Sequence, residues 1–130
     1  MIALIDQGQG DVHLKCRAAQ QTLRGPLLTT WPCVTEAMYF LYKLRGWEGQ
    51  QALWDFYLKG ALLIHSISKA ETLRMSVLME NYHDTPMDLA DASLVIAAET
   101  LGIKIIFTLD SDFYIYRIND KDSFDIVPLN

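Results

Sequence analysis

The sequence has little cysteine and no long apolar run. Its two cysteines, Cys16 and Cys33, are too few for a disulfide-rich scaffold, and neither a C-x-x-C pair nor clustered histidines predict zinc. No apolar run approaches the ~20 residues of a membrane-spanning helix, and Met1–Ile5 is too short for the core of a signal peptide. We therefore expect a protein without a membrane segment, in the cytoplasm, where thiols stay reduced.

The composition favours a folded core. Apolar residues make up 51% and charged residues 21% of the 130 residues, which excludes wholesale disorder. A chain of this length can bury most of the surface that its unfolded state exposes. Because no repeat, linker or low-complexity segment divides the chain, we expect one domain over residues 1–130.

The negative charge is concentrated in one third of the chain. Residues 1–83 hold 7 acidic against 8 basic residues, whereas residues 84–125 hold 9 acidic against 3 basic residues. Such a charge run is usually a solvated face. The alternative is a group of carboxylates that holds a divalent cation, and the residues around each acid decide between the two.

Helical and extended patterns alternate along the chain. In residues 31–45, apolar side chains recur at helical spacing and mark a core face, namely Val34, Ala37, Met38, Leu41 and Leu44. The patterns predict helices over 13–24, 31–45, 48–59, 68–82 and 87–101, and strands over 27–30, 61–65, 103–109 and 124–128. This alternation predicts an α/β sandwich with a mostly parallel sheet.

Two acids follow the most apolar of these strands. Asp110 and Asp112 come directly after residues 103–109. Ligands of parallel α/β sheets bind beyond the carboxyl ends of the strands. A polar loop explains either acid alone, but two neighbouring carboxylates repel each other unless a cation or solvent screens them.

Two further acids lie near helix starts. Asp88 fits the N-cap of the helix over 87–101, whereas Asp91 lies among small residues that imply close packing and needs a partner there. Glu36 lies in the apolar stretch Val34–Leu44, where a glutamate is either partly exposed at the edge or paired. A metal is one such partner for Asp91 and for Glu36.

Together these segments resemble a known family. Residues 28–38, 87–97 and 106–113 resemble the second-, third- and fourth-acid motifs of PIN-domain ribonucleases, in family order and at family spacing. The bacterial members most like this sequence are the VapC-type toxins. The resemblance covers nearly the whole chain, and the three motifs are specific when they occur together.

The resemblance implies a three-layer α/β/α domain with a mostly parallel central sheet. It implies that Glu36, Asp91 and Asp110 hold Mg²⁺ or Mn²⁺, with Asp112 in or beside the group, and that these acids are the catalytic residues of an endoribonuclease. Its implied partners are RNA, a small antitoxin and a second copy of the chain.

The start of the chain departs from the family pattern, in which a central strand ends in the first catalytic aspartate. One register makes Met1–Ile5 this strand and Asp6 the acid, but it leaves little room before His13 for the next helix. The register that we prefer aligns Met1–Ile5 with the segment after the acid. It implies that the domain is N-terminally incomplete, lacking the first strand and its aspartate.

Two other functions remain open at this point. A missing first acid favours a catalytically impaired PIN fold that binds RNA or protein. A magnesium-dependent phosphatase would need an aspartyl nucleophile after an early strand, which only Asp6 supplies.

Basic and aromatic residues offer contacts to a nucleic acid. The basic candidates for the RNA backbone are Lys15, Arg17, Lys43, Arg45, Lys59, Lys69 and Arg74. Trp31 and Tyr39 are candidates for base stacking, although core packing is the favoured interpretation for each. Trp47 and Trp54 are expected to fill a core or a dimer face.

Overall fold

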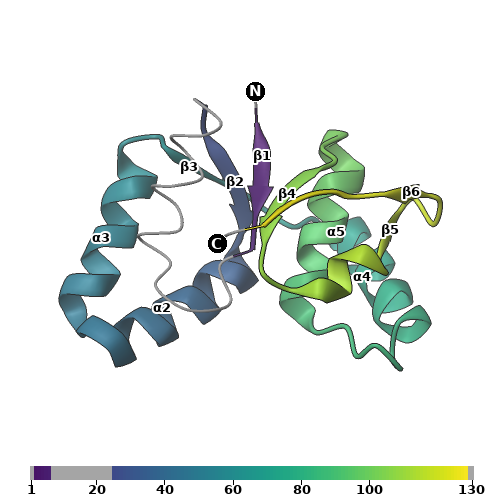
Figure 1. The fold of residues 1–130 in the computed structure, drawn as a ribbon, viewed down its shortest axis with the longest axis horizontal. Coiled ribbons are helices and arrows are strands. Elements are labelled where there is room, and N and C mark those ends of the chain that lie inside the picture. Colours follow the sequence, from purple (N-terminus) through teal and green to yellow (C-terminus); the bar gives the residue numbers. More distant parts are fainter. Residues whose placement is uncertain (1, 7–24, 129–130) are drawn as a thin grey trace.

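A five-stranded parallel sheet forms the centre of the protein (Figure 1). The computed structural model describes residues 2–6 and 25–128. The strand order is β3-β2-β1-β4-β7. The strands are β1 (Ala3–Ile5), β2 (Leu27–Thr30), β3 (Leu62–His65), β4 (Ile105–Thr108) and β7 (Asp125–Pro128).

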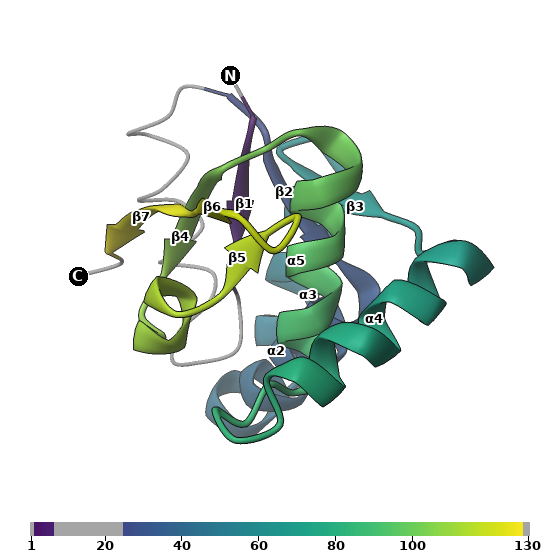
Figure 2. The ribbon, with the colours of Figure 1, turned by 90° about the vertical axis from the view of Figure 1, so that its right-hand side faces the viewer.

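Helices cover both faces of this sheet. One face carries α2 (Trp31–Arg45) and α3 (Trp47–Leu58), and the other carries α4 (Lys69–Asn81) and α5 (Leu89–Leu101). Figure 2 shows α4 and α5 together in front of the sheet. A 3-10 helix η1 (Ser111–Tyr114) and a small hairpin, β5 (Arg117–Ile118) with β6 (Asp122–Ser123), connect β4 to β7.

The alternation of side chains along the strands creates two cores. In β1, Ala3 and Ile5 pack with α2 and α3, whereas Leu4 packs with α4 and α5. In β4, Phe107 packs with α2 and α3, whereas Ile106 packs with α4 and α5. Successive side chains of a strand point to opposite faces, so a buried strand with helices on both sides is apolar throughout. The predicted three-layer α/β/α architecture is confirmed.

The position of β1 corrects our preferred register. Ala3–Ile5 lies between β2 and β4, in the middle of the sheet, and pairs in parallel with both. The expectation that the central strand is missing is therefore wrong. The prediction relied on the short distance between Asp6 and the next expected helix. The position of the strand is determined instead by its pairing with β2 and β4. The predicted helix over 13–24 lies outside the described residues.

Local sequence signals set the helix ends. Asp88 accepts a hydrogen bond from the Asp91 backbone N–H at the start of α5, at 2.8 Å. Ser68 and Glu71 form the expected capping box at the start of α4. Gly102 ends α5 with a φ of 67°, a conformation that favours glycine. The sequence therefore predicts these boundaries well.

Several surface assignments differ from expectation. Trp31, Tyr39 and Leu44 are exposed on α2, so the predicted core packing of these three side chains is wrong. Trp47 and Trp54 are also exposed, which leaves the dimer face as the prediction for them. Among the described helices, none is long and apolar enough to cross a bilayer.

Arg74 performs a structural task. Its guanidinium donates to both carboxylate oxygens of Glu99 and to Asp120, each at 3.0 Å. Glu99 also accepts the Asn119 backbone N–H at 2.7 Å. Arg74 thus ties the turn of the β5–β6 hairpin to α4 and α5, and these contacts compete with the RNA contact that the sequence suggested for it.

Candidate metal centre

Three aspartates meet at the carboxyl ends of the two central strands. Asp6 follows β1, Asp110 follows β4, and Asp91 lies in the first turn of α5. Each offers a carboxylate oxygen, and these oxygens all lie within 4.8 Å of one another. We call Asp6, Asp91 and Asp110 the carboxylate cluster. The parallel pairing of β1 with β4 brings Asp6 beside Asp110, because it aligns the ends of these strands.

Thr108 links two members of this cluster. Its buried hydroxyl donates to Oδ2 of Asp6 at 2.9 Å. The Thr108 hydroxyl oxygen also accepts a hydrogen bond from the backbone N–H of Asp110 at 2.9 Å. The Asp6 backbone N–H in turn donates to the Phe107 carbonyl at 2.9 Å. Thr108 at the end of β4 therefore orients the Asp6 carboxylate and fixes the backbone at Asp110.

Asp91 is held in a tightly packed environment, as its small neighbours predict. The residue is only 8% exposed, and Ala92 and Ser93 are fully buried. The Ser93 hydroxyl donates to the Ala90 carbonyl at 2.6 Å and also contacts the Thr30 hydroxyl. The close approach of α5 to β2 therefore requires small side chains at this turn.

The direct partner of Asp91 is a buried phenol. Tyr116 donates its hydroxyl to Oδ2 of Asp91 at 2.8 Å. The Tyr116 ring packs edge-on against Phe113, at 5.0 Å between ring centroids, and against Tyr82, at 5.2 Å. These rings fix the position of the phenol. The hydrogen bond therefore sets the orientation of the Asp91 carboxylate.

The environment of Asp91 disfavours its charge. Burial raises the pKa of Asp91 to about 7, although the hydrogen bond from Tyr116 acts in the opposite direction. The nearby charges of Asp88, Asp6 and Asp110 raise this pKa as well. Like charges in a partly desolvated site favour a bound cation, because the cation removes the repulsion.

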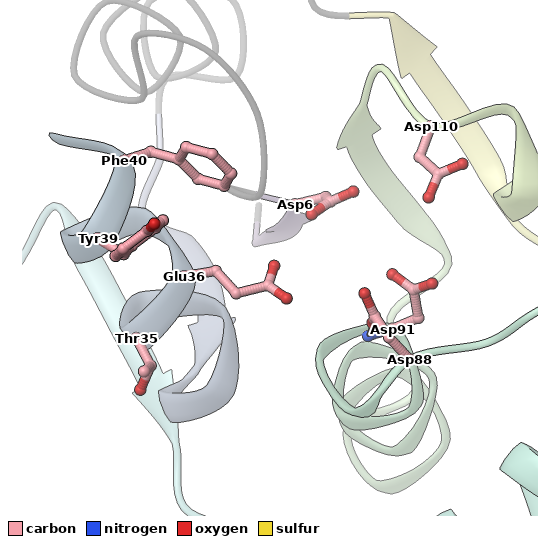
Figure 3. A pocket seen from close by; sticks show the side chains of 8 residues that line it. All are labelled: Asp6, Thr35, Glu36, Tyr39, Phe40, Asp88, Asp91 and Asp110. Carbon is pink, nitrogen blue, oxygen red and sulfur yellow. Dashed lines mark hydrogen bonds between the residues drawn. The ribbon is translucent and has the colours of Figure 1, made fainter. Parts of the chain in front are cut away.

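The cluster opens into a cavity of about 560 Å³ (Figure 3). Its lining residues are Asp6, Thr35, Glu36, Tyr39, Phe40, Asp88, Asp91 and Asp110. Glu36 lies on α2, on the opposite wall, and Figure 3 shows its carboxylate extending toward the aspartates. Burial raises the pKa of Glu36, as do the charges of Asp88 and Asp6. The structure thus brings Glu36 to the same cavity, outside the closest group of three.

Asp112 has a different position. It lies in η1, and its backbone N–H donates to Oδ1 of Asp110 at 2.9 Å. Its carboxylate belongs neither to the carboxylate cluster nor to the lining of the cavity in the described residues. Burial and the charge of Asp110 raise the pKa of Asp112. Its metal-binding role remains a prediction, whereas its backbone orients Asp110.

The sequence reasoning missed three residues of this site. It weighed Asp6 but preferred the register without it, and it considered neither Thr108 nor Tyr116. The strand-end rule was a sufficient signal for Asp6, which directly follows a short apolar run. Thr108 follows from the same rule, since it ends β4. No sequence signal pairs Tyr116 with Asp91, because they are 25 residues apart and meet only through tertiary packing.

The donor set fits a hard divalent cation. Mg²⁺ and Mn²⁺ prefer oxygen ligands, and Mg²⁺ is commonly held by a few carboxylates together with water. The three convergent oxygens of the carboxylate cluster offer such ligands, next to a cavity with room for water. If the cluster holds an ion, the contacts of Thr108 and Tyr116 orient its ligands.

Replacing Tyr116 by phenylalanine is expected to lower Mn²⁺ affinity about 10-fold or more. The variant keeps the ring that packs against Phe113 and Tyr82 but removes the hydrogen bond to Asp91. Isothermal titration calorimetry with Mn²⁺ measures the change. Tyr114→Phe is the matched control, because Tyr114 is an exposed tyrosine of the same segment. Equal affinity in Tyr116→Phe and wild-type protein would show that this hydrogen bond does not support the site.

The comparisons with known proteins concern the fold. Neither a protein-family model nor a curated protein matches the sequence significantly. The solved structure of Mycobacterium tuberculosis VapC20, a Sarcin-Ricin loop cleaving toxin, is similar with a TM-score of 0.73 and 14% identity. The similarity covers 93% of this chain and 98% of that chain.

A second similar structure is that of VapBC2 from Rickettsia felis, which is bound to a DNA fragment from the VapBC2 promoter. Its TM-score is 0.64, with 15% identity over 98% of both chains. At these identities the similarity shows a shared fold, and both structures match nearly the whole chain. This chain therefore has the three-layer, PIN-like α/β/α fold of VapC-type proteins.

Proposed function

We propose that this protein is a metal-dependent endoribonuclease of the PIN class that hydrolyses RNA phosphodiester bonds. The observation that carries the proposal is the convergence of Asp6, Asp91 and Asp110 at the carboxyl ends of the central strands. This is the edge of a parallel sheet where ligands bind. The fold shared with a toxin that cleaves the Sarcin-Ricin loop supports the choice of RNA as substrate.

Each residue has a defined task in this proposal. The carboxylate cluster holds Mg²⁺ or Mn²⁺, and Glu36 faces it across the cavity as a further acid. A bound cation lowers the pKa of its water and neutralises the phosphate under attack. Thr108 and Tyr116 orient Asp6 and Asp91 through their hydrogen bonds.

An acidic protein needs basic side chains on its surface to bind the phosphate backbone of RNA. The exposed basic side chains of the layer formed by α2 and α3 are candidates, namely Lys43, Arg45 and Lys59. Lys69, at the start of α4, is exposed as well. These residues would contact the phosphate backbone, whose affinity for proteins falls steeply with salt. Lys15 and Arg17 lie outside the described residues.

The proposal also includes a protein partner. The VapBC2 structure, which is bound to promoter DNA, has a similar fold. We infer that the protein is the toxin of a toxin–antitoxin pair, with a small antitoxin as its partner. The exposed Trp47 and Trp54 are candidates for a protein contact, either with that antitoxin or with a second copy of the chain.

The decisive experiment is an RNA cleavage assay with metal-stripped protein. A labelled RNA is incubated with the protein in EDTA, and then with Mn²⁺ or Mg²⁺ restored. We expect cleavage only in the presence of the metal. An Asp110→Asn preparation controls for contaminating nucleases, because it should lack this cleavage. Asp84→Asn, which alters an exposed acid, should cleave like wild-type protein.

Two other outcomes would replace the proposal. Absence of cleavage together with absence of metal binding would indicate a non-catalytic binding module. Hydrolysis of p-nitrophenyl phosphate without RNA cleavage would indicate a phosphatase, in which Asp6 acts as the nucleophile. The ground for the binding module was a missing first aspartate, whereas Asp6 follows the central strand β1 and lies close to Asp91 and Asp110, which supports the ribonuclease proposal.

A further inference from the structure

One face of α2 carries two aromatic rings beside the carboxylate cluster. Glu36, Tyr39, Phe40 and Lys43 are three or four residues apart, so they share this face. Tyr39 and Phe40 line the same cavity as the aspartates. In Figure 3 both rings lie on the α2 wall of the cavity, opposite Asp91 and Asp110. The face thus passes from a carboxylate through aromatic rings to a cation over about 10 Å of helix.

These rings are exposed rather than buried in the core. Tyr39 is 58% exposed and Phe40 is 37% exposed, although both are large and apolar. The fold itself does not need them at these positions, because α2 packs on the sheet through Val34, Ala37 and Leu41. The rings therefore present apolar surface to whatever enters the cavity.

The rings are also held in place. Tyr39 and Phe40 pack edge to face, with centroids 5.6 Å apart and an interplanar angle of 68°. The Lys43 ammonium lies 4.6 Å from the centroid of the Tyr39 ring, in a cation–π contact. Because these contacts order the rings before any ligand binds, less conformational entropy is lost when one does.

We propose that Tyr39 and Phe40 form a base-stacking platform that selects unpaired nucleotides next to the cleavage site. Aromatic side chains stack on bases that have left a duplex, whereas bases inside a duplex offer no open face. Lys43 then meets the phosphate beside the stacked base. This inference rests on the proposed ribonuclease function and assigns Tyr39 and Phe40 as the residues that recognise an unpaired base.

The negative charge of the cavity explains why an uncharged contact with the substrate is useful there. The carboxylate cluster and Glu36 repel the phosphate backbone until a cation neutralises them. Stacking is a contact between uncharged surfaces, so it attracts the substrate without competing with the metal for the acids. Lys43 contacts the Tyr39 ring and does not line the cavity, so its charge is available to a phosphate that flanks the stacked base.

The test measures binding separately from cleavage. A fluorescently labelled single-stranded RNA, and the same strand annealed to its complement, are titrated with the full-length protein in EDTA. We expect tighter binding of the single strand. The double variant Tyr39→Ala/Phe40→Ala should weaken binding of the single strand about 10- to 100-fold, with little effect on the duplex. Tyr39→Phe should bind like wild-type protein, because the ring remains.

Tyr42→Ala is the matched control. Tyr42 is a 61% exposed aromatic residue on the same helix, outside the lining of the cavity, so its loss should leave RNA binding unchanged. Thermal denaturation confirms that each variant folds. Equal affinity for both RNA forms, no binding by wild-type protein, or equal effects of the double variant and Tyr42→Ala would each overturn the inference.

A kinetic measurement separates this inference from the proposed function. With Mn²⁺, the double variant should raise KM for single-stranded RNA about 10-fold or more and leave kcat largely unchanged. If the protein cleaves no RNA, the proposed function fails, and the binding titration in EDTA still decides the base-stacking platform. If it cleaves RNA with an unaltered KM in the double variant, only the platform fails.

Discussion

Asp6→Asn is expected to abolish metal binding and to reduce metal-dependent RNA cleavage at least about 100-fold. Asp6 supplies one of the three convergent carboxylates, and a metal in such a site contributes several kcal/mol of transition-state stabilisation. Asparagine keeps the size of the side chain and accepts the hydrogen bond from Thr108, so the fold should persist. Calorimetry with Mn²⁺ and the RNA cleavage assay measure both effects.

This substitution also tests the position of the first strand. If β1 is the central strand and Asp6 its terminal acid, the loss of metal binding should be as complete as in Asp110→Asn. Asp84→Asn serves as the surface control, because its carboxylate is exposed. Wild-type metal affinity in Asp6→Asn would mean that Asp91 and Asp110 bind the ion with other ligands, and that Asp6 is structural.

Asp91→Asn is expected to have opposite effects on activity and on stability. It removes a ligand of the proposed metal, so metal-dependent cleavage should be lost. It also removes a buried charge that Asp88, Asp6 and Asp110 repel. The amide oxygen of asparagine still accepts the hydrogen bond from Tyr116. We therefore expect the metal-free variant to be more stable than metal-free wild-type protein at pH 7 and above.

The sign and size of this stability effect follow from linkage. The pKa of Asp91 is raised from 3.8 to about 7 in the folded protein, so between these values the folded state binds more protons than the unfolded state. The free energy of unfolding of the metal-free protein should therefore fall as the pH rises through this window. Removing the charge should stabilise the metal-free protein by roughly a few kcal/mol at neutral pH, which raises its Tm by several degrees.

Thermal denaturation of both proteins in EDTA from pH 4 to pH 8 provides the measurement. The difference in Tm should be small near pH 4 and grow toward pH 8, and it isolates Asp91 because all other acids are common to both proteins. Adding Mn²⁺ should raise the Tm of wild-type protein and leave Asp91→Asn unchanged. A variant less stable than wild-type protein throughout this range would show that the Asp91 charge stabilises the fold.

The two strand ends of the site differ in how far sequence alone could predict them. The sequence identifies Asp110 because the apolar run over 103–109, which predicts a buried strand, is followed directly by acids. Asp6 follows a run of similar character but shorter length, and the spacing to the next expected helix argued against it. The pairing of Ile5 with Phe107 decides the question, and no local pattern encodes a contact across 102 residues.

The surface of α2 illustrates the same limit. Its periodicity correctly predicts that Val34, Ala37 and Leu41 face the core. It does not predict that Tyr39 and Leu44 are exposed. Helical spacing shows which side of the helix faces the core, but not how much of that side the neighbouring elements cover. An aromatic ring at the edge of that face is buried or exposed according to what lies beyond it, which here is the cavity.

The sequence by itself determined the alternation of helices and strands, the caps of α4 and α5, and the identity of Asp91 and Asp110 as candidates. These follow from hydrogen bonds and side-chain patterns within a few residues. The tertiary structure alone decided the central position of β1, the entry of Asp6 into the carboxylate cluster and the contact of Tyr116 with Asp91. Each of these depends on residues far apart in the chain, which come together only when sheet pairing and core packing fix their distances.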